Sequence, residues 1–413
     1  MEETAQGNPV FDKEEWRRYG LILIPCVLGM MLVALYVYTL GVVIAPLEEE
    51  FGWTRSEISA ASLVTSTALL FLAPFGGRAV DRYGPRKIAL IGVPAFSGAI
   101  AMLSLANSNI LSWYALYLLL SFATVLVYPT VWTAAIAMRF VKNRGMALAI
   151  TLSGTGLTSA IVPRVAAGLL EEFGWRGVYV GLGILCFVVV YPFVFALFDK
   201  TSPEDKKEAS KAATETVSGA PPKELFRCKF NKLALAAFTY SAAVTMLAVN
   251  TVPVLMADGF ELIRAAEIAG LIGVGTICGR LLGGLLLDRM DARYVAILCG
   301  LGAIIAVSIL LAFDQSALAA SAACFSLGVA GGAEYDACAY LATRHFDKRN
   351  FGTLFGLISG LTGFGAGVSP IVANAVYDIT GSYDPVLWGL VPALAVASML
   401  FLSIGRYPDA PER

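Results

Sequence analysis

The stretch GGRAVDRYGPRK, residues 76–87, decides the fold, because its pattern returns later in the chain as GGLLLDRMDAR, residues 283–293. In both places a Gly-x-x-x-Asp-Arg motif follows a long apolar run. The two copies consist of Gly77, Asp81 and Arg82, and of Gly284, Asp288 and Arg289. A pair of arginines recurs at nearly the same offset, as Arg139 with Arg144 and again as Arg344 with Arg349. The chain is therefore predicted to contain two repeats of similar design.

Long apolar stretches fill most of the 413 residues. Hydrophobic residues make up 57% of the chain and charged residues only 15%, and the mean hydropathy is +0.72. Each of the following twelve stretches is long enough to cross a hydrocarbon core of about 30 Å as a helix. They are residues 19–45, 58–79, 87–107, 110–138, 144–171, 176–198, 231–258, 264–287, 292–313, 316–343, 351–377 and 385–404. The pattern predicts an all-α membrane protein with twelve transmembrane helices in two pseudo-symmetric six-helix bundles.

The basic residues predict the orientation in the membrane. If the N-terminus is cytoplasmic, cytoplasmic segments hold 25 of the 30 Lys and Arg residues. External loops then hold Arg55, Arg176 and Arg264, and the helices hold Arg164 and Arg280. Lys and Arg concentrate in the cytoplasmic loops of membrane proteins. We therefore predict a multi-pass protein of the cell inner (cytoplasmic) membrane with both termini in the cytoplasm.

Shifts in composition divide the chain into five predicted segments. Residues 199–230 are rich in Lys, Glu, Ala, Ser and Pro, and they are too polar to build a core, which predicts a cytoplasmic linker. The other segments are a cytoplasmic N-terminal segment (1–18), an N-terminal six-helix bundle (19–198), a C-terminal six-helix bundle (231–404) and a cytoplasmic tail (405–413). Two repeats of this kind place a substrate path at their interface, near the bilayer midplane.

Several classes of function are disfavoured by the composition. A net charge of -1 argues against a nucleic-acid partner. The seven cysteines show no metal-ligand spacing and are interpreted as small apolar residues. The sequence has no nucleotide-binding loop and no pairing of a nucleophile with a base. We therefore predict that the protein is not an enzyme and uses no metal or other cofactor.

GGRAVDRYGPRK resembles the loop 2–3 signature of the major facilitator superfamily, and GGLLLDRMDAR resembles its degenerate second copy. The resemblance covers nearly all of the chain and implies a charged latch that holds the cytoplasmic helix ends together in the outward-facing state. Asp81 is expected near the N-terminus of the helix opening at Gly145, where the dipole and free N–H groups favour an anion. The expected cytoplasmic gate comprises Gly77, Asp81, Arg82, Arg139, Arg144, Gly284, Asp288, Arg289 and Arg344. The alternative is a loop that only satisfies the charge rule for cytoplasmic segments.

Three further segments resemble the branch of this superfamily that holds monocarboxylate transporters and oxalate/formate antiporters. They are APLEEEFGWTRSEISAASL (45–63), EEFGWRGVY (171–179) and GTICGRLLGGLLLDR (275–289). In that branch an arginine midway along helix eight binds the substrate carboxylate, which implies this role for Arg280. The chain departs from animal monocarboxylate transporters at Leu40 and Gly41, where they have a lysine, and at Thr276, where they have an aspartate. It also lacks the helix-eleven lysine of oxalate exchangers, so its single cation favours a substrate with one carboxylate.

The depth of Arg280 in the membrane supports the same role. Arg280 lies eight residues before Asp288, which puts it about 12 Å above the cytoplasmic boundary at about 1.5 Å per residue. This is close to the midplane of a core about 30 Å thick, where a cation costs at least about 2.5–3.5 kcal/mol. A guanidinium suits a carboxylate because its planar fork donates two parallel hydrogen bonds. The alternative to a substrate anchor is a permanent salt bridge that only fixes helix packing.

Glu334 and Asp336 interrupt a long apolar run, ten and eight residues before Arg344. They are expected about 15 and 12 Å above the cytoplasmic boundary, at the depth of Arg280. Because they are two positions apart on a helix, they point about 200° away from each other. One acid is expected near Arg280, where it can take up and release a proton as it loses and gains that partner. The other is expected near the second Asp-Arg cluster; the alternative is that both belong to the latch.

Four aromatic residues, Tyr36, Tyr128, Tyr240 and Phe364, are expected at middle depth, where they can enclose the carbon skeleton of a small acid or serve only packing. The predicted function is a secondary active transporter that moves a small organic anion, with a monocarboxylate favoured, by alternating access and proton symport. The alternatives are an anion exchanger and an efflux transporter for amphiphilic compounds. The expected partners are the anion, protons and membrane lipid, and the transporter is expected to function as a monomer.

Overall fold

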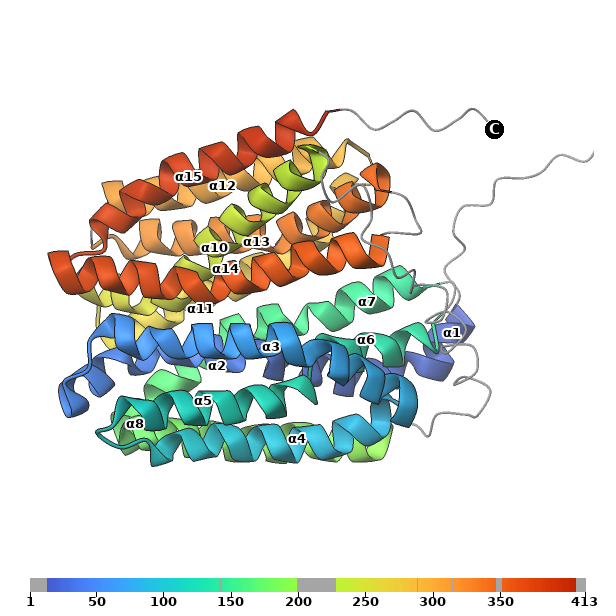
Figure 1. Cartoon of the computed structure of the whole chain (residues 1–413), viewed down its shortest axis with the longest axis horizontal. Helices are drawn as coiled ribbons and strands as arrows, with labels where there is room; N and C mark the ends of the chain where they lie inside the picture. Colours follow the sequence, from blue (N-terminus) through green and yellow to red (C-terminus); the bar gives the residue numbers. More distant parts are fainter. Residues whose placement is uncertain are drawn as a thin grey trace, which may run out of the picture.

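The computed structural model describes residues 13–140, 143–198, 228–287, 289–313, 315–346 and 351–405. Within these ranges the regular elements are all helices, as predicted (Figure 1). Most of the predicted N-terminal segment, most of the linker, nearly all of the tail and the gate residue Asp288 lie outside the described residues. The helices are α1 (Lys13–Tyr19), η1 (Gly20–Ile22), α2 (Leu23–Phe51), α3 (Arg55–Tyr83), α4 (Pro85–Met102), η2 (Leu103–Leu105), α5 (Ile110–Val125), α6 (Pro129–Ala137), α7 (Arg144–Leu152), α8 (Gly154–Leu197), α10 (Cys228–Ala257), α11 (Leu262–Leu287), α12 (Ala292–Ala312), α13 (Ala317–His345), α14 (Phe351–Thr380) and α15 (Asp384–Ser403).

Eleven helical segments in the described part of the chain are long and apolar enough to cross a membrane. One of them, Arg144–Leu197, has 54 residues, which is far more than one crossing needs. Helix α8 in this segment is interrupted at Gly174, whose φ of 66° and ψ of 179° are accessible to glycine at little cost. A Cβ built on Gly181 would lie only 2.9 Å from the Cδ1 atom of Leu169, twelve residues earlier. Residues so far apart along one straight helix cannot touch, so the chain turns back at Gly174. Helix α8 therefore consists of two antiparallel limbs that meet at Gly174, between the predicted spans 144–171 and 176–198; the start of the first span is the separate helix α7.

The predicted span 110–138 is broken near its middle. Helix α5 ends at Val125 and α6 begins at Pro129. Proline forces the residue before it out of the helical conformation, and Tyr128 accordingly has a ψ of 155°. The backbone at the break lies against Gly76 of α3 and Gly92 of α4, which have no side chains to obstruct it. The break places Tyr128 at the start of a helix instead of inside one.

The helices form two bundles that lie one above the other in Figure 1, with α2–α8 in the N-terminal half and α10–α15 in the C-terminal half. Within the C-terminal half, α11 packs closely on α13 through small residues. Gly275 and Gly279 of α11 lie against the backbone at Val329 of α13, and Gly332 of α13 lies against the backbone at Thr276. Glycine permits this approach, which is how helices without a hydrophobic driving force associate in lipid. The close packing fixes which residues of α11 and α13 face each other.

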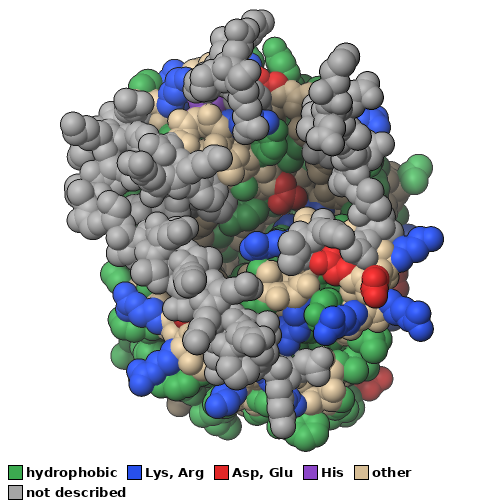
Figure 2. Space-filling model, turned by 90° about the vertical axis from the view of Figure 1, so that its right-hand side faces the viewer, with side chains coloured by type: hydrophobic (Ala, Val, Ile, Leu, Met, Phe, Trp, Pro, Cys, Tyr) green, Lys and Arg blue, Asp and Glu red, His purple; other side chains and the backbone are tan. Residues whose placement is uncertain are grey.

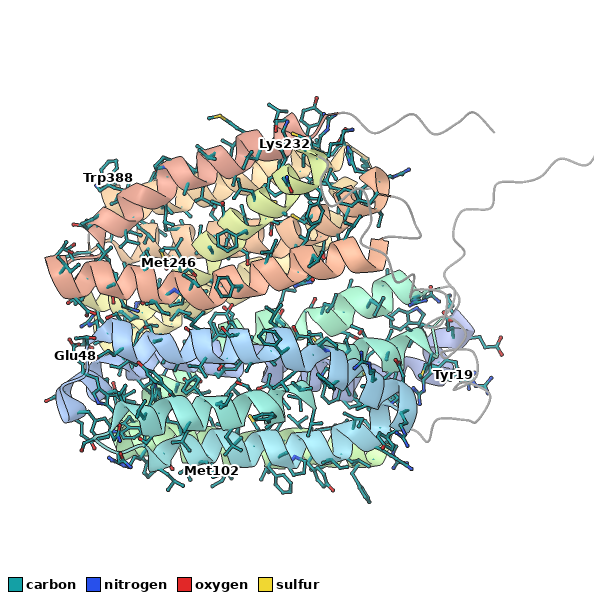
Figure 3. All side chains as sticks on the ribbon, in the orientation of Figure 1. Tyr19, Glu48, Met102, Lys232, Met246 and Trp388 are labelled. Atoms are coloured by element: carbon teal, nitrogen blue, oxygen red, sulfur yellow. The ribbon has the colours of Figure 1, made fainter. Side chains whose placement is uncertain are left out.

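The two halves are in contact at the end where α2 runs into α3. There the Ser62 hydroxyl donates to the carbonyl oxygen of Gly367 at 3.2 Å, and Gly41 lies against the backbone at Val249. Glu48 lies at this end, whereas Tyr19 and Lys232 lie at the opposite end (Figure 3). Seen from that opposite end, the molecule is hollowed between the halves, and Lys and Arg side chains lie around the hollow (Figure 2).

Candidate functional site

A cavity of about 420 Å³ lies between the two halves. Its walls come from α2, α3, α10 and α14, and from the break between α5 and α6. Tyr36 and Tyr128 line it, so the structure brings together two of the four aromatic candidates. The hydroxyl-bearing residues Ser62, Ser66 and Ser359 also line it, among mostly apolar neighbours. Its lining from both halves makes this cavity a candidate for substrate binding.

Arg280 lies on the face of α11 that packs against α13, and it pairs there with Asp336. Its Nη1 atom is 3.7 Å from Oδ1 of Asp336, and the two side chains are 13% and 31% exposed. This distance makes an ion pair, but it is too long for a hydrogen bond. The Nε atom of Arg280 is buried and has no hydrogen-bond partner within the described ranges. A guanidinium with unused N–H donors can bind a further anion such as a carboxylate.

Residues from both halves surround this ion pair. Tyr335, next to Asp336 on α13, lies within electrostatic range of Arg280. The Tyr335 hydroxyl is 3.4 Å from Oγ of Ser359, which lines the cavity. Tyr38 of α2, in the N-terminal half, is also within electrostatic range of Arg280. Arg280 is not among the described residues that line the cavity, but Tyr335 links its surroundings to Ser359 of the lining, and Tyr38 links them to the N-terminal half.

Glu334 and Asp336 point to different places, as their spacing predicts. Glu334 is buried and only 5% exposed, and one of its carboxylate oxygens accepts a hydrogen bond from the Cys338 thiol at 2.9 Å. It lies inside the C-terminal half, within electrostatic range of Tyr240 on α10. Asp336 is the acid that faces Arg280. The second acid was expected near the cluster of Asp288 and Arg289, but Asp288 lies outside the described residues.

The other two aromatic candidates are not among the residues that line the cavity. Tyr240 is 1% exposed, and its hydroxyl donates to the carbonyl oxygen of Cys299 at 3.3 Å, which holds α10 against α12. Phe364 lies on an exposed face of α14 together with Leu357 and Leu361. This face is suited to lipid contact, so the geometry favours packing and lipid-facing roles for these two residues.

The contact between the halves at the Glu48 end centres on the start of α3. The backbone N–H groups of Arg55 and Ser56 donate to the two oxygens of Asp378 on α14, at 3.1 and 2.9 Å. An acid from the C-terminal half thus caps a helix of the N-terminal half, where the helix dipole favours negative charge. The Arg55 guanidinium lies 3.9 Å from the ring centre of Tyr377 and donates to the Tyr383 hydroxyl at 3.1 Å.

Asn374 of α14 extends this contact toward the cavity. Its Nδ2 group donates to Oγ of Ser59 at 2.6 Å and to Oδ1 of Asn250 at 2.9 Å, and its Oδ1 accepts from the Tyr383 hydroxyl at 2.8 Å. Burial raises the pKa of Tyr383 to about 12, so its hydroxyl stays protonated near neutral pH and can donate to Asn374 while accepting from Arg55. We call Arg55, Ser59, Asn374, Asp378 and Tyr383 the external closure, since the predicted orientation places them outside.

The predicted cytoplasmic gate is only partly assembled. Gly77, Asp81 and Arg144 line one surface cleft, but Asp81 makes no ion pair within the described residues. A Cβ built on Gly77 or on Gly284 would meet nothing within 4 Å. Within the described residues, neither glycine therefore makes a close contact with another helix at the open end of this structure.

The gate arginines make local contacts. The Arg82 guanidinium lies 5.3 Å from the Tyr83 ring centre, Nη1 of Arg139 donates to the Ala135 carbonyl, and Nη2 of Arg344 donates to the Tyr340 hydroxyl. Arg289 is exposed.

The start of α7 is capped by an acid that the sequence did not single out. Oε2 of Glu15 on α1 accepts hydrogen bonds from the backbone N–H of Asn143 at 2.9 Å and from its side chain at 2.8 Å. Asp81 was expected at this helix start, which opens at Arg144. In this structure the anion-favouring position thus holds Glu15.

Comparison with known proteins agrees with this arrangement. The sequence model described as "Major Facilitator Superfamily" matches residues 26–370 and 233–413. The chain is 26% identical over 411 residues to a gallate transporter of Pseudomonas putida, covering 91% of this chain and 90% of that protein. It is 26% identical over 407 residues to a probable sulfoacetate transporter of Cupriavidus necator, covering 90% of each. It is 26% identical over 322 residues to monocarboxylate transporter 12 of Homo sapiens, covering 70% of this chain and 61% of that protein.

Two solved structures share the fold. The nucleoside transporter NupG matches with a TM-score of 0.73 at 13% identity, over 94% of this chain and 100% of that chain. A bacterial homolog of the human lysosomal transporter Spinster matches with a TM-score of 0.67 at 16% identity, over 97% of this chain and 100% of that chain. At these identities the likeness shows the fold alone.

Proposed function

The chain belongs to the Major Facilitator Superfamily, and we propose that it is a secondary transporter that moves a small organic anion, preferably a monocarboxylate, by alternating access. The observation that carries the proposal is Arg280, which is mostly buried beside Asp336 of α13 and whose Nε–H has no hydrogen-bond partner among the described residues. Relatives that carry gallate, sulfoacetate and, by name, monocarboxylates support an anionic substrate. No Lys or Arg is among the described residues that line the cavity, so Arg280 is the one cationic anchor in this proposal, and one anchor favours one carboxylate over two.

In the proposed topology the chain crosses the cell inner membrane twelve times. Both termini then lie in the cytoplasm. Because α8 consists of two antiparallel limbs, its segment counts as two crossings, and the eleven helical segments then give twelve crossings. The basic rim of the hollow end supports a cytoplasmic position for that end (Figure 2). The external end is then closed and the cytoplasmic end open. Since one chain encloses the cavity, the unit of transport is a monomer.

Proton coupling follows in this proposal from competition for Arg280. Ionised Asp336 is the counter-charge of Arg280 and opposes a second carboxylate at the same guanidinium. A protonated Asp336 releases Arg280, and the substrate carboxylate takes its place. Proton and monocarboxylate are then bound together, which makes the carrier a symporter. In an anion exchanger, by contrast, Asp336 would not change its charge during the cycle.

Ligand-induced thermal stabilisation in detergent tests the class of substrate. Carboxylic acids at pH 7 are expected to raise the melting temperature, because a ligand that binds only the folded state stabilises it by mass action. Their methyl esters, which have the same carbon skeleton without the charge, are expected to have no effect. Stabilisation by amphiphilic cationic dyes and not by the acids would favour the efflux transporter and reject this proposal.

A matched pair of substitutions tests alternating access. Asp378→Asn weakens the external closure, because it removes the anion that caps α3; Asp81→Asn weakens the expected cytoplasmic gate. Dipole terms of this kind contribute about 0.3–2 kcal/mol, enough to shift a balanced equilibrium severalfold. Distances between spin labels at the two ends are expected to shift toward outward-facing conformers for Asp378→Asn and toward inward-facing ones for Asp81→Asn. A shift in the same direction for both variants would contradict the assignment of the two ends.

A further inference from the structure

One wall of the cavity between the halves is formed by glycines. Gly356, Gly360 and Gly363 of α14 line the cavity, spaced so that they share one face of the helix. A Cβ built on Gly356 or on Gly363 would meet nothing within 4 Å, so both positions open onto free space. At Gly360 the nearest atom to such a Cβ is Cδ1 of Leu70, at 3.0 Å. The wall is therefore a strip of backbone with Leu70 against its middle glycine.

The lining that comes from the N-terminal half includes two tyrosines among aliphatic and hydroxyl-bearing residues. Tyr36 and Tyr128 line the same cavity, and they lie within electrostatic range of each other. Tyr36 is 9% exposed, and its hydroxyl has no hydrogen-bond partner among the described residues. The Tyr36 hydroxyl oxygen is not among the buried atoms that lack a partner, so it is accessible and can exchange hydrogen bonds with water or with a ligand in the cavity. Independently of the glycines, this hydroxyl offers a ligand in the cavity a polar contact that no described residue occupies.

The size of the cavity exceeds what the smallest carboxylic acids need. Pockets of about 300–1,000 Å³ accommodate drug-sized ligands, and this cavity measures about 420 Å³ with a mainly apolar lining. An acid of two or three carbons would leave most of the apolar wall in contact with water, which forgoes the hydrophobic contribution to binding. A ring-sized body fills more of this space, and it can contact the glycine strip of α14 as well as the tyrosines of the N-terminal half.

We infer that this carrier selects carboxylic acids with a flat ring-sized body, and that Gly356, Gly360 and Gly363 set the upper limit of that size. The inference rests on the proposed function, because the carboxylate must be held near Arg280. Ser359 connects the two places, since it lines the cavity beside the glycines and lies 3.4 Å from the Tyr335 hydroxyl, one residue from Asp336. The glycines are specificity-determining residues in this arrangement, and they do not contact the carboxylate.

Binding of benzoate and propionate to the purified full-length protein in detergent tests the inference. Each additional buried CH2-sized group strengthens binding by about fourfold. Benzoate is therefore expected to bind at least about tenfold more tightly than propionate. Gly363→Val fills the free space at the glycine strip. It is therefore expected to lower the affinity for benzoate by about tenfold or more and to change the affinity for propionate by less than about threefold. Gly363→Ala adds a smaller side chain, so it is expected to lower the affinity for benzoate by an intermediate factor and to leave the affinity for propionate unchanged.

The matched control is Gly389→Val on α15, where a Cβ also meets open space but which lies outside the cavity lining. It is expected to bind both acids as the unsubstituted protein does. Equal binding of propionate and benzoate by the unsubstituted protein, or equal losses for both acids in Gly363→Val, would overturn the inference while leaving the proposed function intact. Binding of neither acid by the unsubstituted protein would instead reject the proposed function.

Discussion

Arg280→Lys is expected to weaken carboxylate binding by about 10- to 100-fold while the protein still folds. Lysine keeps the positive charge, but it lacks the planar fork that donates two parallel hydrogen bonds to a carboxylate. Hydrogen bonds to charged groups contribute about 1.5–3 kcal/mol, and about 1.4 kcal/mol corresponds to a tenfold change. Titration of a carboxylic acid by isothermal calorimetry in detergent measures the effect.

Arg264→Lys is the matched control for this substitution. Arg264 lies on the same helix, but it is mostly exposed, and among the described residues it pairs only with Glu267, at 3.3 Å. Exposed pairs of this kind contribute little, so the control is expected to bind the acid normally. If Arg280→Lys also binds it with unchanged affinity, Arg280 is a packing residue and the anchor role is wrong.

Asp336→Asn is expected to abolish accumulation of substrate driven by a pH gradient, while counterflow exchange remains. Asparagine cannot gain or lose the proton, so Arg280 stays available to the substrate carboxylate at every pH. Exchange needs only rebinding of substrate, with no net release of a proton. The two activities are measured in proteoliposomes with an imposed pH difference and with unlabelled substrate inside, respectively.

Glu334→Gln provides the comparison, because Glu334 is buried in the C-terminal half with the Cys338 thiol as its hydrogen-bond donor and does not face Arg280. It is expected to retain gradient-driven accumulation. Loss of accumulation in Glu334→Gln with retention in Asp336→Asn would exchange the roles of the two acids. Retention in both variants would exclude a proton role for either of them.

Much of the fold follows from counting along the sequence. Hydropathy and the repeated motif locate the helical segments, and the rise per residue places Arg280 and Asp336 at one depth. Their two-residue spacing also predicts that Glu334 and Asp336 point apart, as they do. Pro129 indicates a break before α6, because proline disfavours the helical conformation of the residue before it. The predicted span over 110–138 does not include this break.

The remaining features depend on which face of a helix meets which neighbour. Predicted depth in the membrane places Phe364 and Tyr36 together in one pocket. In the structure, however, Phe364 lies on an exposed face of α14 and Tyr36 lines the cavity. The capping of α3 by Asp378 joins residues that are more than 300 positions apart, and no local pattern in one sequence connects them. Similarly, the sequence predicts an anion at the start of α7 but not that Glu15 supplies it.

The central claim is that Arg280 anchors a carboxylate during proton-coupled transport. Uptake of radiolabelled benzoate into proteoliposomes with an alkaline interior tests it most directly, with protein-free liposomes measuring passive entry of the neutral acid. We predict protein-dependent accumulation that disappears when the pH difference is collapsed and is absent in Arg280→Lys. Equal protein-dependent uptake by the unsubstituted protein and by Arg280→Lys would contradict the account.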